Sequence, residues 1–195
     1  TPKDAKGPLP ILLMRTPYGS DTYLISIGPS VDFEKAGYIF ALQDVRGTYQ
    51  SEGDFVNVRP YNPRKQGNEF DEASDTYDTI DWMVKHVAGN NGNVGVWGIS
   101  YLGFYATMAA LSGHPALKAV SPQAPVSDWF LGDDFHHNGA LFLGDAFSFL
   151  STFGLPRPVP TRARAKPYVY GTPDGYRFFL EAGPLADISA GKMAN

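Results

Sequence analysis

Ser100 lies in the segment Gly98-Ile99-Ser100-Tyr101-Leu102-Gly103, which has the residue types of a nucleophilic turn. A serine hydroxyl is a weak nucleophile unless it is exposed on a strained turn, beside a base and close to donors for an oxyanion. Glycine two residues before the serine relieves crowding in a tight strand-to-helix bend, and the following helix N-terminus favours negative charge. The generic pattern has glycine two residues after the serine, but Leu102 occupies that position here and the glycine comes one residue later.

The pattern has a structural alternative, because any strand-to-helix turn needs small residues for packing. Its context favours a catalytic interpretation. The segment 94–98 predicts a buried strand before the serine, and the apolar segment 104–111 predicts a helix after it. In a parallel sheet this turn would lie at the carboxyl edge, where the active sites of α/β proteins lie. We therefore predict Ser100 as the nucleophile.

The elements that must position Ser100 alternate between strands and helices. Short apolar runs predict four strands, at 9–14, 38–45, 94–98 and 117–122. Between Asp71 and Gly89 the pattern is helical, with acids early, bases late, and an apolar stripe of Tyr77, Ile80, Val84 and Val87. This order predicts an α/β fold, a mostly parallel sheet with flanking helices. Beyond Val126 the sequence is rich in aromatic residues, Gly and Pro, with helical fragments at 140–149 and 174–182 and no convincing strand.

Further motifs accompany the G-x-S-Y-x-G turn: Arg15-Thr16-Pro17-Tyr18, Gln43-Asp44-Val45-Arg46-Gly47, Ser51-Glu52-Gly53-Asp54, Asp78-Thr79-Ile80-Asp81-Trp82 and Gly132-Asp133-Asp134-Phe135. In their order and rough spacing they resemble the serine hydrolases that group cocaine esterase, X-Pro dipeptidyl-peptidases, glutaryl acylases and α-amino acid ester hydrolases, most of all the last. The resemblance implies a partial α/β-hydrolase fold. Residues 1–126 would form the N-terminal part of the core with the nucleophile turn, and residues 127–195 the beginning of a helical cap.

The resemblance also implies roles for three residues. The Tyr18 hydroxyl and the Tyr101 backbone N–H would donate hydrogen bonds to the oxyanion, and Asp134 would bind a substrate ammonium group. Taken without the resemblance, Tyr18 could equally be an aromatic residue that caps a strand end, and Asp134 a solvated loop acid or helix cap. For Asp44 and Arg46 we favour a structural role near the site, and for the three tryptophans a place in the core or a pocket wall: Trp82, Trp97 and Trp129.

No histidine in the chain fits the catalytic triad, which runs Ser, acid, His along this fold. Each of the four is better interpreted as a surface or loop residue: His86, His114, His136 and His137. Asp174 and Asp187 have no histidine after them, which argues against either as the triad acid. We expect the acid and the histidine in a C-terminal part of the same enzyme, and expect this chain alone to be inactive.

Composition excludes several classes of function. The chain has no cysteine, hence no disulfide, thiolate metal site or cysteine nucleophile. Its net charge of −4, without a basic stripe, does not predict nucleic-acid binding. No apolar run has the length to cross a bilayer, so we expect no membrane partner. Histidines and acids show no metal-ligand spacing, and no metal or other cofactor is expected. The chain does not begin with Met, so we expect a processed or partial product, and the compartment stays open.

The sequence thus predicts a serine hydrolase or acyltransferase that acts through an acyl-enzyme on Ser100. By resemblance its partners would be small-molecule esters or amides with a free α-amine, including β-lactam antibiotics, and the enzyme would be a periplasmic or secreted homo-oligomer. Two alternatives within enzymes stay open, a glutaryl acylase and a cocaine-esterase-like carboxylesterase. The alternative from another class is a non-catalytic binding domain with the hydrolase fold.

Overall fold

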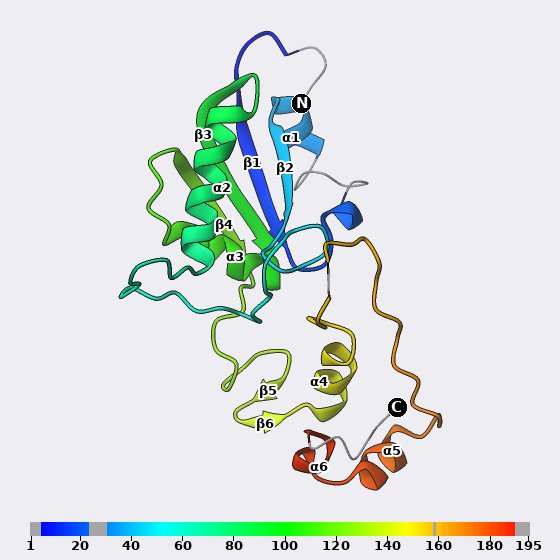
Figure 1. Ribbon diagram of the computed structural model, residues 1–195. Helices are drawn as coiled ribbons and strands as arrows, with labels where there is room; N and C mark the ends of the chain where they lie inside the picture. Colours follow the sequence, from blue (N-terminus) through cyan, green and yellow to red (C-terminus); the bar gives the residue numbers. More distant parts are fainter. Residues whose placement is uncertain (1–4, 24–30, 158, 190–195) are drawn as a thin grey trace. The chain divides into compact units, whose positions relative to one another are not determined.

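A computed structural model describes residues 5–23, 31–157 and 159–189 (Figure 1). At its centre lies a four-stranded sheet of β1 (Leu9–Thr16), β2 (Ile39–Asp44), β3 (Asn90–Ile99) and β4 (Leu117–Gln123). The strand order is β2-β1-β3-β4 and every neighbouring pair is parallel. The predicted α/β class is therefore confirmed. β3 starts at Asn90, four residues before the predicted strand 94–98.

The parallel register brings the carboxyl ends of the strands to one edge. Thr16 pairs with Asp44 at the ends of β1 and β2, and Ile99 pairs with Gln123 at the ends of β3 and β4. Ser100 directly follows β3, which lies inside the sheet between β1 and β4. The predicted nucleophile therefore sits at the edge where loops from neighbouring strands converge.

Two helices cover one face of the sheet, α2 (Glu72–His86) and α3 (Tyr101–Ala110). Alternate residues of the strands point to this face and bury their side chains against both helices, and the resulting core consists of Ile11, Leu13, Ile39, Ile80, Met83, Val94, Val96, Ala106 and Ala109. The predicted stripe of α2 is correct for Ile80, and Val84 and Val87 pack partly buried against the core. The prediction that Tyr77 belongs to this stripe is wrong, because Tyr77 remains 40% exposed and Met83 takes the inward position.

The N-terminus of α2 is fixed by a reciprocal capping arrangement. The Asp71 carboxylate accepts a hydrogen bond from the Ser74 backbone N–H at 2.9 Å, and the Ser74 hydroxyl accepts one from the Asp71 N–H at 2.8 Å. Lys65 also donates to Asp71, at 2.5 Å. Burial tends to raise the pKa of Asp71, but the hydrogen bonds from Lys65 and from two backbone N–H groups outweigh it and lower the pKa.

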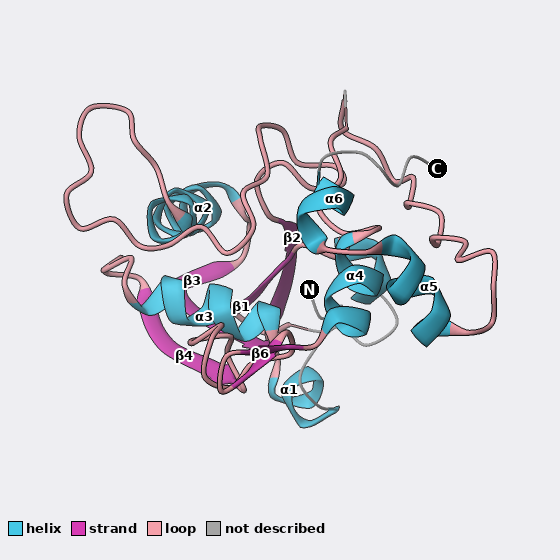
Figure 2. Cartoon of the chain, turned by 90° about the horizontal axis from the view of Figure 1, so that it is seen from below, coloured by secondary structure: helices cyan, strands magenta, loops and turns pink. Residues whose placement is uncertain are grey.

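The opposite face of the sheet carries a short helix, α1 (Val31–Ala36), which the sequence did not predict. Figure 2 shows α1 and α2 on opposite sides of the strands. A second unpredicted element, the 3-10 helix η1 (Ser20–Tyr23), follows β1 closely. Both have at most six residues, too few for a hydrophobic period to stand out in the sequence.

The described residues form two compact units. The first comprises those within Thr1–Trp129 and Pro156–Ala163, and the second those within Phe130–Leu155 and Arg164–Asn195. The second unit contains the two-stranded hairpin β5 (His136–His137) and β6 (Ala140–Leu141), then α4 (Leu143–Leu150), α5 (Gly175–Ala182) and α6 (Leu185–Ser189). The hairpin corrects the expectation of no further strand, since two residues per strand are too few for an alternating pattern. Aromatic rings fill this unit, with Phe147 against Tyr168, Phe178 and Phe179.

Candidate active site

Ser100 occupies a strained turn between β3 and α3. Its backbone has φ 60° and ψ −122°, a conformation that residues other than glycine rarely adopt. The Ser100 N–H donates to the Gln123 carbonyl at 2.9 Å, and the Ser100 carbonyl accepts from the Phe104 N–H at 3.0 Å. These bonds tie the turn to the end of β4 and to the first turn of α3. A strained, exposed serine on a strand-to-helix turn is the geometry of a nucleophile elbow.

Two glycines allow this turn to pack tightly. A Cβ at Gly98 would lie 2.2 Å from the Leu102 carbonyl oxygen, and a Cβ at Gly103 would lie 2.6 Å from the Gln123 carbonyl oxygen. Gly98 therefore lets the first turn of α3 lie against β3, and Gly103 lets it lie against the end of β4. The glycine that comes one residue later than in the generic pattern thus has a packing reason.

Tyr18 and Tyr101 meet at the same edge of the sheet. Tyr18 follows the end of β1, and its N–H donates to the Thr16 hydroxyl at 3.0 Å. Its ring lies edge-on to the Tyr101 ring, with the centroids 6.1 Å apart. Since Tyr101 is the residue after Ser100, the fold brings together three of the residues that the sequence predicts for the site. Their catalytic roles stay predictions.

The side chain of Tyr101 has a structural function. It is buried, and its hydroxyl donates to Asn57 Oδ1 at 2.7 Å and accepts from the Val58 N–H at 2.7 Å. Burial raises the pKa of Tyr101 to about 12, so the phenol stays protonated at neutral pH. Tyr101 is also the first residue of α3, where backbone N–H groups point out of the helix end. Any contribution of Tyr101 to an oxyanion site would therefore come from its main chain.

A buried arginine, Arg15, connects the end of β1 to neighbouring elements through its side chain. The sequence did not indicate this role beyond the place of Arg15 in the Arg15-Thr16-Pro17-Tyr18 motif. Arg15 is 1% exposed; its guanidinium donates to Gln43 Oε1 at 2.8 Å and to the Thr76 hydroxyl at 2.7 Å. It also pairs with Glu72 at 3.3 Å. Burial raises the pKa of Glu72, although the nearby Arg15 charge acts in the opposite direction. This network fixes the end of β1 to the start of α2.

Arg46 and Asp44 have separate partners. Arg46 makes a two-pronged ion pair with Asp75, at 2.8 and 2.6 Å, and lies 4.0 Å from the centroid of the Phe70 ring. The hydrogen bond that Arg46 donates to Asp75 raises the pKa of Arg46, since it stabilises the charged form. Asp44 instead accepts hydrogen bonds from the Ser20 and Gln50 backbone N–H groups. Both side chains therefore anchor loops around the site.

The two histidines of the first unit lie away from Ser100. His86 ends α2 and His114 follows α3, whereas Ser100 precedes α3, a helix about 15 Å long. His114 is a loop residue, as expected, but it is buried, edge-on to Tyr77 at 4.5 Å and 3.8 Å from Asp81. Neither histidine can reach the serine as its base. The other two form β5 of the second unit.

Asp134 also belongs to the second unit, in the segment before β5. Its side chain is exposed, and its backbone N–H donates to the carboxylate of Asp133 at 2.6 Å. Its proposed part in binding an ammonium group stays a prediction. No group of three or more potential metal ligands occurs within residues 5–23, 31–157 and 159–189. In the same ranges no helix has the length and apolarity to cross a membrane.

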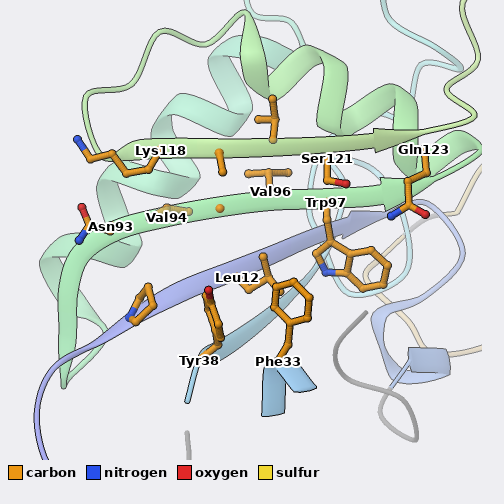
Figure 3. Close-up of a pocket in the computed structure, with 14 residues that line it drawn as sticks. Leu12, Phe33, Tyr38, Asn93, Val94, Val96, Trp97, Lys118, Ser121 and Gln123 are labelled. Carbon is orange, nitrogen blue, oxygen red and sulfur yellow. The ribbon is translucent and has the colours of Figure 1, made fainter. Parts of the chain in front are cut away.

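A groove of about 420 Å³ lies on the sheet face opposite α2 and α3 (Figure 3). Leu12 and Trp97 contribute to it from the sheet, while Phe33 of α1 and Tyr38 stand beside them. Trp97 therefore lines a pocket, as predicted. Trp82 does not, because it is 58% exposed and stacks on His86. Neither Ser100 nor Tyr18 lines this groove, so it is distinct from the candidate active site.

The fold and the strained serine turn define an α/β-hydrolase-type core. The model of the X-Pro dipeptidyl-peptidase (S15) family matches residues 1–171, and the chain therefore belongs to this family. It is 34% identical over 167 residues to cocaine esterase from Rhodococcus sp. (strain MB1 Bresler), which covers 84% of this chain and 27% of that protein.

Solved structures agree with this assignment. An aminopeptidase from the marine sediment archaeon Thaumarchaeota archaeon superposes with a TM-score of 0.80 at 32% identity, over 98% of this chain and 32% of that one. A selenomethionine-labelled α-amino acid ester hydrolase superposes with a TM-score of 0.80 at 36% identity, over 97% of this chain and 31% of that one. The chain thus spans about a third or less of these relatives. The predicted resemblance is confirmed.

Proposed function

We propose that this chain carries the nucleophile of a serine ester or amide hydrolase, with Ser100 forming an acyl-enzyme. The observation that supports this most directly is the Ser100 backbone, at φ 60° and ψ −122°, exposed between β3 and α3. Strain of this kind costs roughly 1–3 kcal/mol and is retained mainly where function requires it. Membership in a family that includes peptidases and esterases agrees with the proposal.

The chemistry would proceed in two halves. The Ser100 hydroxyl attacks the substrate carbonyl and passes its proton to a base, giving a tetrahedral intermediate whose oxyanion accepts hydrogen bonds from the Tyr18 hydroxyl and the Tyr101 N–H. The intermediate expels the alcohol or amine, which takes up the proton, and leaves the acyl group on Ser100. Water then attacks the acyl-enzyme by the same steps. The base and its acid partner would come from sequence outside this chain.

The first experiment is labelling of the native protein, together with the part that would supply the base, with a fluorophosphonate, followed by intact mass spectrometry and peptide mapping. We expect one adduct on Ser100 and none in Ser100→Ala, with Ser121→Ala labelled like the wild type as the matched control. A folded, native protein without an adduct on Ser100 would contradict the proposal and favour a non-catalytic binding domain.

For the substrate we propose esters or amides whose acyl group carries a free α-amine, including β-lactam antibiotics, with Asp134 binding the ammonium group. The 36% identity to an α-amino acid ester hydrolase supports this choice, and a carboxylate favours a cation over a neutral group. A carboxylesterase is the second candidate, because cocaine esterase is 34% identical.

Asp134→Asn separates the two substrate classes. We expect it to reduce kcat/KM for esters with a free α-amine at least tenfold more than for the matching neutral esters, since only the former lose an ion pair. Asp133→Asn is the matched control, with one neighbouring charge removed and no such difference expected. Equal losses on both kinds of ester would refute the role of Asp134 without affecting Ser100.

A further inference from the structure

Asp44 is a buried carboxylate placed between the two loops that leave β1 and β2. It is the last residue of β2 and is 6% exposed. Its Oδ1 accepts from the Ser20 N–H at 2.5 Å and its Oδ2 from the Gln50 N–H at 3.2 Å. In the ranges that the structure describes, no ion pair includes it. Burying a carboxylate without a neighbouring cation is costly, and the two backbone hydrogen bonds offset part of that cost. A buried acid held in this way requires a structural or functional reason.

The hydrogen bond to Ser20 fixes the turn that carries Tyr18. This turn is held at its start, where the Tyr18 N–H donates to Thr16 Oγ1 at 3.0 Å. Two residues after Tyr18 it is held again, by Asp44 at the Ser20 N–H. Tyr18 therefore lies between two anchors, one local and one from the neighbouring strand. The first anchor relates Tyr18 to its own strand β1, and the second relates it to β2.

The other carboxylate oxygen binds a loop that is itself held firmly. The Ser51 hydroxyl donates to the Asp44 carbonyl at 2.5 Å. From the segment 156–163 of the same unit, the Arg157 guanidinium donates to the carbonyls of Gly47, Tyr49 and Ser51. The 47–51 loop is thus a rigid support, and Asp44 transmits its position to the Tyr18 turn.

From this geometry we infer that Asp44 is a positioning residue, which holds the Tyr18 hydroxyl where it can stabilise the oxyanion. The inference rests on the proposed function of Ser100 and Tyr18. Donors of this kind act mainly in the transition state, and a displacement of about 1 Å can cost on the order of 10²-fold in rate. Asp44 itself touches no reacting atom.

The test is a double-mutant cycle of Asp44→Asn and Tyr18→Phe in the native protein, with kcat and KM measured on an ester substrate. An asparagine keeps one acceptor oxygen but turns an NH₂ group toward the other backbone N–H. We expect Asp44→Asn alone to lower kcat about 10- to 100-fold with little change in KM. In the Tyr18→Phe background it should lower kcat less than about threefold, because the hydroxyl that it positions is already absent.

A merely structural role would give a different result. Asp75→Asn is the control, since Asp75 is also a buried acid of this unit but pairs with Arg46 and does not touch the Tyr18 turn. Its effect on kcat should be the same in both backgrounds. The inference is overturned if Asp44→Asn behaves in the same way, or if it lowers thermal stability while kcat is unchanged.

Two further measurements keep the test decisive. If Asp44→Asn does not fold, Ser20→Pro removes the same hydrogen bond from the donor side, at the first residue of a helical turn, where proline is tolerated.

Fluorophosphonate labelling of the wild type and measurement of kcat for Tyr18→Phe come before the double-mutant cycle. No label on Ser100 and no effect of Tyr18→Phe would refute the proposed function and this inference together, whereas success there with an additive cycle would refute the inference alone.

Discussion

Ser100 adopts a backbone conformation that glycine reaches at little cost and other residues reach only with strain. Replacing it by alanine removes the hydroxyl and keeps the strain, because alanine has a Cβ. Replacing it by glycine removes both. We therefore predict that Ser100→Gly is more stable than Ser100→Ala, the reverse of the usual order.

The magnitude follows from two opposing contributions. Relief of an unfavourable backbone conformation contributes roughly 1–3 kcal/mol. The greater freedom of glycine in the unfolded chain offsets about 0.5–1 kcal/mol of this. The net stabilisation of the glycine variant is about 0–2.5 kcal/mol, and about 1 kcal/mol from the middle of both ranges. Each 1 kcal/mol raises Tm by about 2–4 °C in a chain of 150–250 residues.

The measurement is the free energy of unfolding of both variants, from urea denaturation followed by circular dichroism and checked by Tm. Ser121 is the matched control, since it is also exposed but lies within the extended β4. There the alanine variant should be more stable, by about 0.5–1 kcal/mol. Finding the same order at Ser100 as at Ser121 would refute the assignment of strain to the nucleophile turn, and with it the main physical support for catalysis.

Three further predictions concern the surroundings of this turn. Gly98→Ala should lower stability by at least about 1–3 kcal/mol and reduce fluorophosphonate labelling, because its Cβ meets the backbone of Leu102. Gly95→Ala should do neither, because its Cβ would lie 3.2 Å from the flexible Leu12 side chain and 3.8 Å from the Ala119 carbonyl oxygen, an ordinary contact distance. Tyr101→Phe should cost about 1–3 kcal/mol in urea denaturation, because it removes both hydrogen bonds of a buried hydroxyl, while labelling stays within a few-fold of the wild type; a collapse of labelling would contradict a main-chain role. The lowered pKa of Asp71 gives stability that is present above pH 3.8 and lost as the pH falls toward its folded value, so Asp71→Asn should show a smaller loss of Tm between pH 5 and pH 3 than the wild type. An unchanged pH profile would argue against this contribution.

Local patterns predicted the strands and the main helices. The apolar run at 9–14 falls within β1, because a strand buried in a parallel sheet needs a continuous run of apolar residues. The run at 117–122 falls within β4, an outer strand of the sheet whose residues are mostly exposed. The acids at the start of α2 and the bases at its end predicted its position, because charges that complement the helix dipole can be seen within one short segment of sequence. Trp82 shows the limit of such reasoning, because the sequence shows that it is large and apolar but not that α2 turns it toward solvent.

In the candidate site, too, some features follow from local sequence and others do not. The residue types around Ser100 were enough to predict a tight turn with a nucleophile, since glycine and serine are needed there for local steric reasons. Ser20 lies 24 residues from its partner Asp44, and the side-chain partners of Arg15 lie 28 to 61 residues away along the chain. No local pattern encodes these contacts. Only the packing of β1 beside β2 and beneath α2 brings these groups together.

The sequence alone therefore determined the fold class and the family and predicted the nucleophile, because each depends on short-range periodicity or on motifs that are contiguous in the chain. The tertiary structure decided which side chains support the turn: the Asp44 bridge to the Tyr18 loop, the buried Arg15 network, and the main-chain rather than side-chain availability of Tyr101. The physical reason is that burial and hydrogen-bond partnership depend on which distant segments meet in space, and only the completed sheet with its helices fixes that.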